Sequence, residues 1–118
     1  MRVYRTDREG VQVLRLSGEI DRADAEMLSS RLGGRIGGCC ILDFAGVRHV
    51  DYRAFGILER LTHQNHGVIF SGFSDYLLSI LVFVSDMEMA PIFSTWRTAL
   101  RWLQAERGKL GAGAAVGA

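Results

Sequence analysis

The stretch VRHVDYRAFGILERL, residues 47–61, joins a strand-like run to a helix-like run at Asp51. Backbone amides at the start of a helix attract anions, so a corner of this kind can carry chemistry. Ser, Thr or Gly would be expected next to the carboxylate, but the chain has Tyr52 and Arg53 there. The sequence therefore raises the question of whether this corner is active or has lost an activity.

Each charged residue of this corner has more than one interpretation. Asp51 can cap the following helix, which contributes about 1 kcal/mol, and it can also contact a partner. Arg53 lies in the first helical turn, where the helix dipole disfavours a cation by a few tenths of a kcal/mol. A salt bridge to Asp21, to Asp51 or to a partner carboxylate would explain the charge, and a solvated side chain is the alternative.

Other residues with chemical potential lack the spacing that chemistry requires. His49, His63 and His66 have no acidic or cysteine residue at ligand spacing, so we interpret them as solvated and expect no metal. The adjacent pair Cys39-Cys40 does not have the spacing of a zinc site either. No catalytic triad, phosphate-binding loop or dinucleotide motif is recognisable. We therefore expect neither an enzyme nor a cofactor.

Length, net charge and the apolar runs exclude further classes of protein. The chain has 118 residues, which favours one domain, and its formal net charge of +1 argues against a nucleic-acid partner. The N-terminus has no apolar signal segment, and the apolar run YLLSILVFV at 76–84 is far shorter than the roughly 20 residues that span a bilayer. We expect a cytoplasmic protein.

The hydrophobic pattern alternates between strands and helices. It predicts strands at 2–6, 11–17, 39–44, 67–73 and 89–93, and helices at 22–32, 52–65, 75–84 and 95–106. The order ββαβαβαβα predicts an α/β fold with a mostly parallel central sheet, an N-terminal hairpin strand and crossover helices. Pro91 places the last strand at an edge. Residues 1–107 form the predicted domain, and the Gly/Ala-rich residues 108–118 a disordered tail.

Two helices carry specific expectations. In the helix at 52–65, the apolar stripe leaves Glu59 facing water. The helix at 75–84 is apolar nearly all round, so Leu78, Val82 and Phe83 cannot all be buried. We therefore expect these three residues to form an apolar patch that binds either a second copy of the chain, as a homodimer, or another partner protein. The alternative is that part of this segment is a buried strand.

Two motifs carry a resemblance to a known family. LRLSGEIDRADAEML (14–28) and ILDFAGVRHVDYRAFGILERL (41–61) resemble the STAS family, named for sulfate transporters and anti-sigma-factor antagonists. In the antagonists, the second motif reads Asp-Ser-Ser/Thr-Gly, and its second hydroxyl residue is phosphorylated by an anti-sigma kinase. Asp51 matches the Asp, Tyr52 the first hydroxyl residue, Arg53 the phosphoacceptor and Ala54 the Gly. The resemblance therefore implies a degenerate phosphorylation site.

The resemblance also implies a function. It points to a non-enzymatic regulatory module that binds an anti-sigma factor or kinase, or another regulatory protein, without a phosphorylation switch. The residues that it implies for partner binding are Asp21, Arg22, Asp51, Tyr52, Arg53, Phe55 and Gly56. One alternative is an accessory subunit on the permease of a lipid-type ABC transporter. A second is a sensor of a small ligand, lipid or nucleotide.

Overall fold

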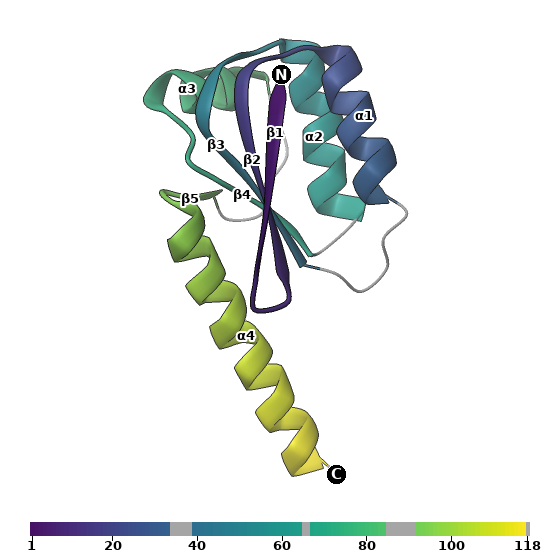
Figure 1. Ribbon diagram of the computed structural model, residues 1–118, viewed down its shortest axis with the longest axis vertical. Coiled ribbons are helices and arrows are strands. Elements are labelled where there is room, and N and C mark those ends of the chain that lie inside the picture. The colour runs from purple at the N-terminus through teal and green to yellow at the C-terminus, as the bar shows by residue number, and fades with distance from the viewer. Residues whose placement is uncertain (34–38, 65–66, 85–91, 118) are drawn as a thin grey trace.

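The computed structural model describes residues 1–33, 39–64, 67–84 and 92–117 (Figure 1). The elements in chain order are β1 (Arg2–Arg8), β2 (Val11–Ile20), α1 (Arg22–Gly33), β3 (Cys39–Val50), α2 (Tyr52–Gln64), β4 (Val68–Ser71), α3 (Asp75–Val84), β5 (Ile92–Phe93) and α4 (Trp96–Gly117). This order confirms the predicted α/β fold. None of the helices in the described ranges is long and apolar enough to cross a membrane.

The five strands form one sheet in the order β1-β2-β3-β4-β5. β1 and β2 are antiparallel and form the predicted hairpin, while the other neighbouring strands are parallel. The hairpin turn has positive φ angles at Glu9 (51°) and Gly10 (80°), which suit the right-handed twist of the two strands. β5 lies at the edge of the sheet, as Pro91 predicts, although Pro91 itself lies outside the described residues.

Helices cover both faces of the sheet (Figure 1). Alternate residues of a strand point to opposite faces, so Leu14 and Leu16 of β2 face one core and Val11 and Val13 face another. The first core is closed by α1, α2 and α3, and the second by α4. The crossover helices α1 and α2 thereby lie next to each other on one face.

Two strands continue further than their sequences predict. β2 ends at Ile20 rather than at residue 17, and β3 ends at Val50 rather than at residue 44. Gly18 does not break β2, because its positive φ of 88° and the register shifts around it let pairing with β3 resume. The longer strands bring the starts of α1 and α2 to the same end of the sheet.

Two predictions about the helices are corrected, namely the exposure of Glu59 and the end of α4. Glu59 was expected to face water, but it is only 8% exposed, because α2 packs against α1 on one side and α3 on the other. α4 runs to Gly117, beyond the predicted end at residue 106, and no proline follows Pro91 to stop it. The domain boundary at residue 107 and the character of the tail stay predictions.

α3 is helical over its whole apolar run, so no part of it is a buried strand. Leu77 and Leu81 are buried against the core, and Ser74 caps the helix through a 3.1 Å hydrogen bond from Leu77 N–H to its Oγ. Val82 and Phe83 are 79% and 89% exposed. The helix therefore has more apolar surface than the sheet covers.

Candidate functional site

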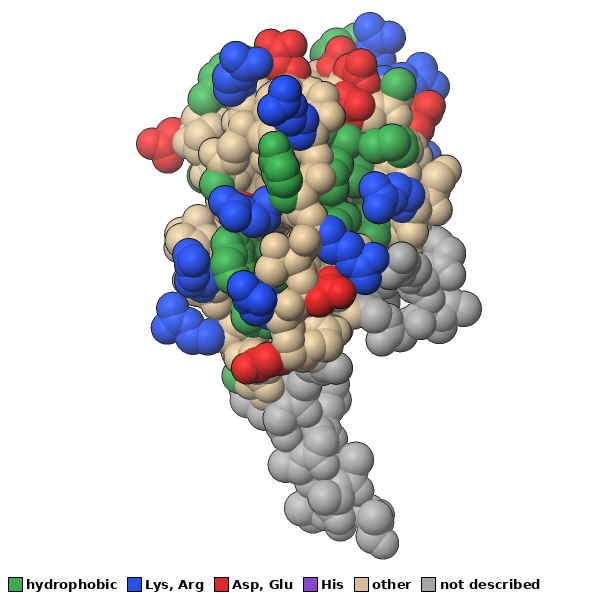
Figure 2. Space-filling model, viewed as in Figure 1, with side chains coloured by type: hydrophobic (Ala, Val, Ile, Leu, Met, Phe, Trp, Pro, Cys, Tyr) green, Lys and Arg blue, Asp and Glu red, His purple; other side chains and the backbone are tan. Residues whose placement is uncertain are grey.

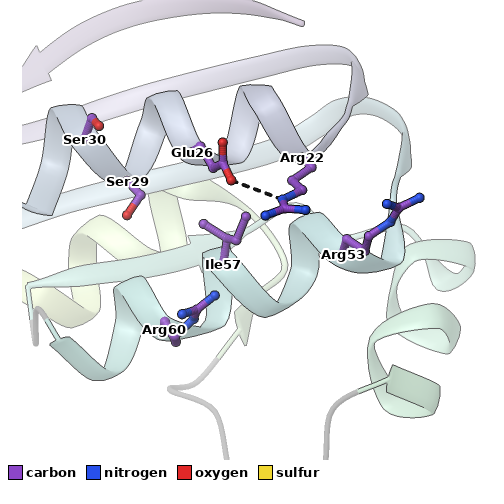
Figure 3. A pocket seen from close by; sticks show the side chains of 7 residues that line it. All are labelled: Arg22, Glu26, Ser29, Ser30, Arg53, Ile57 and Arg60. Atoms are coloured by element: carbon purple, nitrogen blue, oxygen red, sulfur yellow. Dashed lines mark hydrogen bonds and ion pairs between the residues drawn. The ribbon is translucent and has the colours of Figure 1, made fainter.

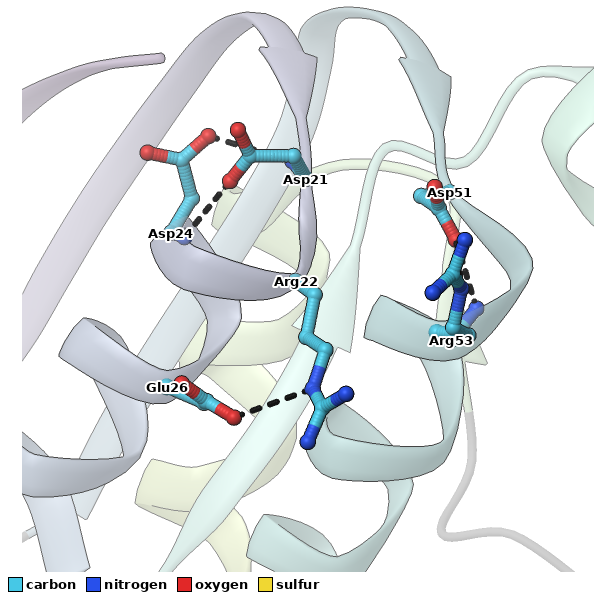
Figure 4. A network of polar contacts seen from close by, with 6 residues as sticks. All are labelled: Asp21, Arg22, Asp24, Glu26, Asp51 and Arg53. Atoms are coloured by element: carbon cyan, nitrogen blue, oxygen red, sulfur yellow. Dashed lines mark hydrogen bonds and ion pairs between the residues drawn. The ribbon is translucent and has the colours of Figure 1, made fainter.

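The starts of α1 and α2 lie side by side at one end of the sheet (Figure 4). The backbone N–H of Asp51 donates a 2.9 Å hydrogen bond to the carbonyl of Ile20, which adds one rung beyond the last paired residues of β2 and β3. We call these two helix starts the α1 corner, residues 21–24, and the α2 corner, residues 51–54. The bond holds the two corners at a fixed separation.

Asp51 is the N-cap of α2. Its Oδ1 accepts a 2.9 Å hydrogen bond from the backbone N–H of Arg53, and its carbonyl accepts a 2.8 Å bond from Ala54. Arg53 Nε lies 3.8 Å from the same Oδ1, and the guanidinium carbon is 5.5 Å from the centre of the Tyr52 ring. Of the carboxylates considered from the sequence, Asp51 is thus the one that Arg53 meets.

The residues predicted for partner binding differ in exposure. Tyr52 is 63% exposed, and the Arg53 side chain is 59% exposed, so both are available at the α2 corner. Gly56 lies on the outer surface of α2, with open space where a Cβ would stand. Phe55 is 1% exposed and packs in the core. Its side chain positions α2 and is not part of the accessible surface.

Asp21 and Asp24 cap α1 reciprocally (Figure 4). The backbone N–H of Asp24 donates a 2.8 Å hydrogen bond to Asp21 Oδ1, and the backbone N–H of Asp21 donates a 3.1 Å bond to Asp24 Oδ2. The hydrogen bond from the backbone of Asp24 lowers the pKa of Asp21 below its ordinary value. Each of the two carboxylates therefore caps α1 by accepting a hydrogen bond from the backbone of the other residue.

A groove of about 480 Å³ lies between α1 and α2 (Figure 3). Four of its lining residues come from α1: Arg22, Glu26, Ser29 and Ser30. Three come from α2: Arg53, Ile57 and Arg60. We call this the α1–α2 groove. It begins at the two corners and continues along both helices for about two turns. Among its lining residues are three guanidinium groups and a single carboxylate.

Hydrogen bonds and ion pairs hold each arginine of the groove through its Nε atom. Arg22 Nε lies 3.1 Å from Glu26 Oε1, and its side chain extends from α1 towards α2 (Figure 4). Arg60 Nε donates to the carbonyl of Gly56 at 3.4 Å. In the part of the chain that the structure describes, these interactions leave the terminal nitrogens of both side chains directed to the surroundings.

Sequence reasoning identified only Arg22 and Arg53 of this groove. Arg60 follows Arg53 by seven residues and therefore lies on the same side of α2. Glu26 follows Arg22 by four residues, which is the spacing of a helical ion pair. These spacings could have identified each helix face, but that the two faces meet follows only from the parallel packing of α1 and α2.

A contact between β3 and α3 was also missed. His49 Nδ1 lies 2.7 Å from the Tyr76 hydroxyl, and their ring centres are 5.9 Å apart. The two residues are 27 positions apart, so no local pattern reveals the pair. His49 therefore supports the position of α3.

Charged side chains are mixed over the surface. Figure 2 shows Lys and Arg side chains dispersed over one face, with hydrophobic patches between them, while acidic side chains gather mainly near its upper end. The basic groups form no continuous field on this face. Within the described ranges, no three His, Cys, Asp or Glu side chains are grouped closely enough to hold a metal ion.

Comparison with known proteins identifies the family. A family model described as the STAS domain matches residues 4–99. The chain belongs to the STAS domain family. No curated protein matches this STAS domain.

Several solved structures share its fold. The anti-sigma factor antagonist SpoIIAA in its unphosphorylated form has a TM-score of 0.62 at 18% identity, covering 87% of this STAS domain and 98% of that chain. SpoIIAA in its phosphorylated form, described as a Bacillus cell fate determinant, has a TM-score of 0.64 at 16% identity, with 86% and 99% covered. The STAS domain of a SulP transporter from Vibrio cholerae has a TM-score of 0.68 at 20% identity, with 88% of each chain covered. At these identities the likeness shows the fold alone.

Proposed function

We propose that this STAS domain is a non-enzymatic regulatory module that binds another protein through its α2 corner. The partner is an anti-sigma factor or kinase, or another regulator of that kind. The proposal also holds that this corner is not switched by phosphorylation. It rests on the family, on the fold shared with an anti-sigma factor antagonist, and on the groups present at the corner.

The single observation that carries the proposal is the side chain at position 53. The α2 corner uses the backbone N–H of Arg53 and the carboxylate of Asp51 to start the helix, which leaves the guanidinium at the surface. A guanidinium accepts no phosphoryl group in Ser/Thr kinase chemistry, and it has a permanent positive charge where a phosphate would bring about −1.5 to −2. The corner therefore keeps the backbone of a docking surface and lacks the chemistry of the switch.

A pull-down from the native host tests this function. Tagged wild type, Arg53→Glu and Arg101→Glu are compared by quantitative mass spectrometry. Arg101 is an exposed arginine on α4 and serves as the matched control for charge reversal. We expect the wild type and Arg101→Glu to retain a regulatory protein that Arg53→Glu loses. Equal retention by all three chains would remove the α2 corner as the docking surface.

Phosphorylation is tested separately on the recovered partner. The wild type is incubated with the partner, Mg²⁺ and ATP, and its intact mass is measured. We expect no added phosphate, because the Arg53 guanidinium cannot accept it. Stoichiometric phosphate on any residue of 51–62 would contradict the absence of a switch, while leaving partner binding in place.

A second candidate function follows from α3. The exposed side chains of Val82 and Phe83 would suit an accessory subunit that docks on the permease of a transporter, such as a lipid-type ABC transporter. Binding to a purified permease that is lost in Val82→Glu/Phe83→Glu and unaffected by Arg53→Glu would favour this function over the first. The third expectation, a small-ligand sensor, would need Tyr52 and the apolar helix α3 to line a pocket. It has no comparable support, since neither Tyr52 nor a residue of α3 lines the α1–α2 groove.

A further inference from the structure

We propose that the α1–α2 groove binds an acidic helical segment of the partner protein, with carboxylates on its arginines and an apolar side chain on Ile57. This inference deepens the proposed function, on which it rests, and it extends the docking surface from the α2 corner to Arg60. The groove is built from two parallel helices, so a third helix can lie along it in ordinary helix packing.

Charge is the first argument for an acidic occupant. The groove contains Arg22, Arg53 and Arg60 but only one carboxylate, Glu26, which is already paired with Arg22. The hydrogen bonds and ion pairs described for these arginines run through Nε. The terminal nitrogens of a guanidinium match the two oxygens of a carboxylate, so an incoming Glu or Asp can bind them in a bidentate manner.

Spacing is the second argument, and it distinguishes a helix from a small anion. Arg53 and Arg60 are seven residues apart on α2, which corresponds to about 10 Å along the helix axis at 1.5 Å per residue. Arg53 Nε is held by Asp51, and Arg60 Nε is held by the carbonyl of Gly56. A single phosphate would have to draw both side chains away from these contacts to bind them together. A helix that lies along α2 repeats the same spacing, so acidic residues at positions i and i+7 would meet both arginines.

The apolar centre of the groove is the third argument. Ile57 lies between the two arginines in sequence, is partly buried and packs on the core. Its exposed part faces the groove, where an apolar residue at i+3 or i+4 of the incoming helix would cover it (Figure 3). A chain of net charge +1 lacks the basic field that usually supports a nucleic-acid partner.

The test uses a defined probe. A fluorescein-labelled helical peptide has Glu at i and i+7 and Leu at i+4, and a matched peptide has Gln in place of both Glu residues. A third peptide has Lys at both positions. Fluorescence anisotropy gives the dissociation constant of each for the wild type, Arg60→Glu and Arg101→Glu. Circular dichroism of the three proteins checks that they are equally folded.

We expect the Glu peptide to bind the wild type and Arg101→Glu equally, and Arg60→Glu at least tenfold more weakly. The Lys peptide should reverse this order and prefer Arg60→Glu. Equal binding of the Gln and Glu peptides, or no binding of the Glu peptide, would overturn the proposal. Displacement by a single-stranded oligonucleotide of equal net charge, at equal concentration, would also overturn it, because the groove would then take any polyanion.

The two proposals fail in different ways. If the partner from the host is lost with Arg53→Glu but retained by Arg60→Glu, the α2 corner remains the docking surface and the groove proposal fails. If the host partner is retained by Arg53→Glu but lost with Arg60→Glu, the α2 corner fails as the docking surface, while the groove still binds the partner through Arg60. Arg60 separates them because it lies about two turns from the corner.

Discussion

Oδ1 of Asp51 lies 2.9 Å from the backbone nitrogen of Arg53 and 3.8 Å from the Nε atom of the same residue. One carboxylate oxygen therefore caps α2 and also lies within ion-pair distance of the Arg53 guanidinium. The hydrogen bond to the N–H contributes more than the exposed ion pair, because solvent screens a pair of this length. The capping role of Asp51 can thus be tested apart from the partner contact proposed for this corner.

Substitution of the cap tests this separation. Asp51→Ala should lower the free energy of unfolding by about 1 kcal/mol, whereas Asp51→Asn should change it little, because Asn is an equally good cap. Urea unfolding followed by circular dichroism measures both. If Asp51→Asn destabilises the protein as much as Asp51→Ala, the charge and not the cap is what stabilises α2.

Gly72 directly follows β4 and has a backbone conformation that other residues rarely adopt. Its φ is +75°, and a Cβ there would stand 2.8 Å from the backbone nitrogen of Ala45 and against the carboxylate of Asp43. Gly72→Ala should therefore destabilise the protein by about 2 kcal/mol or more. Gly56→Ala is the control, since it has open space in a helix and should stabilise by about 0.5–1 kcal/mol. Equal midpoints of thermal unfolding for the two variants would contradict this interpretation of Gly72.

The capping pair of α1 predicts a dependence on pH. The hydrogen bond from the backbone of Asp24 lowers the pKa of Asp21 below its ordinary value of 3.8. The stabilisation is therefore complete above about pH 4 and is lost as the pH falls through the lowered pKa. In urea unfolding from pH 7 to pH 2.5, the wild type should lose stability more steeply at the acid end than Asp21→Asn. Parallel profiles would mean that the pKa of Asp21 is the same in the folded and the unfolded protein, which would contradict this prediction.

The apolar surface of α3 predicts self-association. Val82→Glu/Phe83→Glu should leave the fold intact, because both side chains are largely exposed, and should convert a self-associating wild type into monomers. Sedimentation velocity over a range of concentrations measures this. Ser79→Glu, on an exposed position of the same helix, is the control. Leu78 is half-buried and less suitable for the test. A monomeric wild type at high concentration would exclude α3 as a self-association surface.

The order of elements was predictable because alternation and periodicity are local. Leu14 and Leu16 alternate with polar residues, and Ala25, Leu28 and Leu32 recur at helical spacing, so each element reveals its type without its neighbours. The ends of β2 and β3 were not predictable in this way. Residues 46–50 of β3 are extended because this segment pairs with residues 17–20 of β2. From the sequence alone, Gly18 looks like a residue that ends the strand.

The candidate site was predictable only at its two corners. The α2 corner could be recognised because Asp51 precedes a helical pattern directly. The α1–α2 groove could not, since it depends on which faces of two separate helices meet. Glu59 shows the same limit, because a charged residue indicates solvent unless flanking helices enclose it.

The bond between Asp51 N–H and the carbonyl of Ile20 has a consequence for how such a domain can change its regulation. The backbone of the α2 corner is held by main-chain hydrogen bonds and by the Asp51 carboxylate. The side chain at position 53 is therefore not needed to hold this backbone in place. A hydroxyl or a guanidinium can occupy that position on the same scaffold. Under the proposed function, a reversible switch and a permanent docking surface would differ only in the side chain at position 53, and a regulatory circuit could be rewired there without refolding the protein.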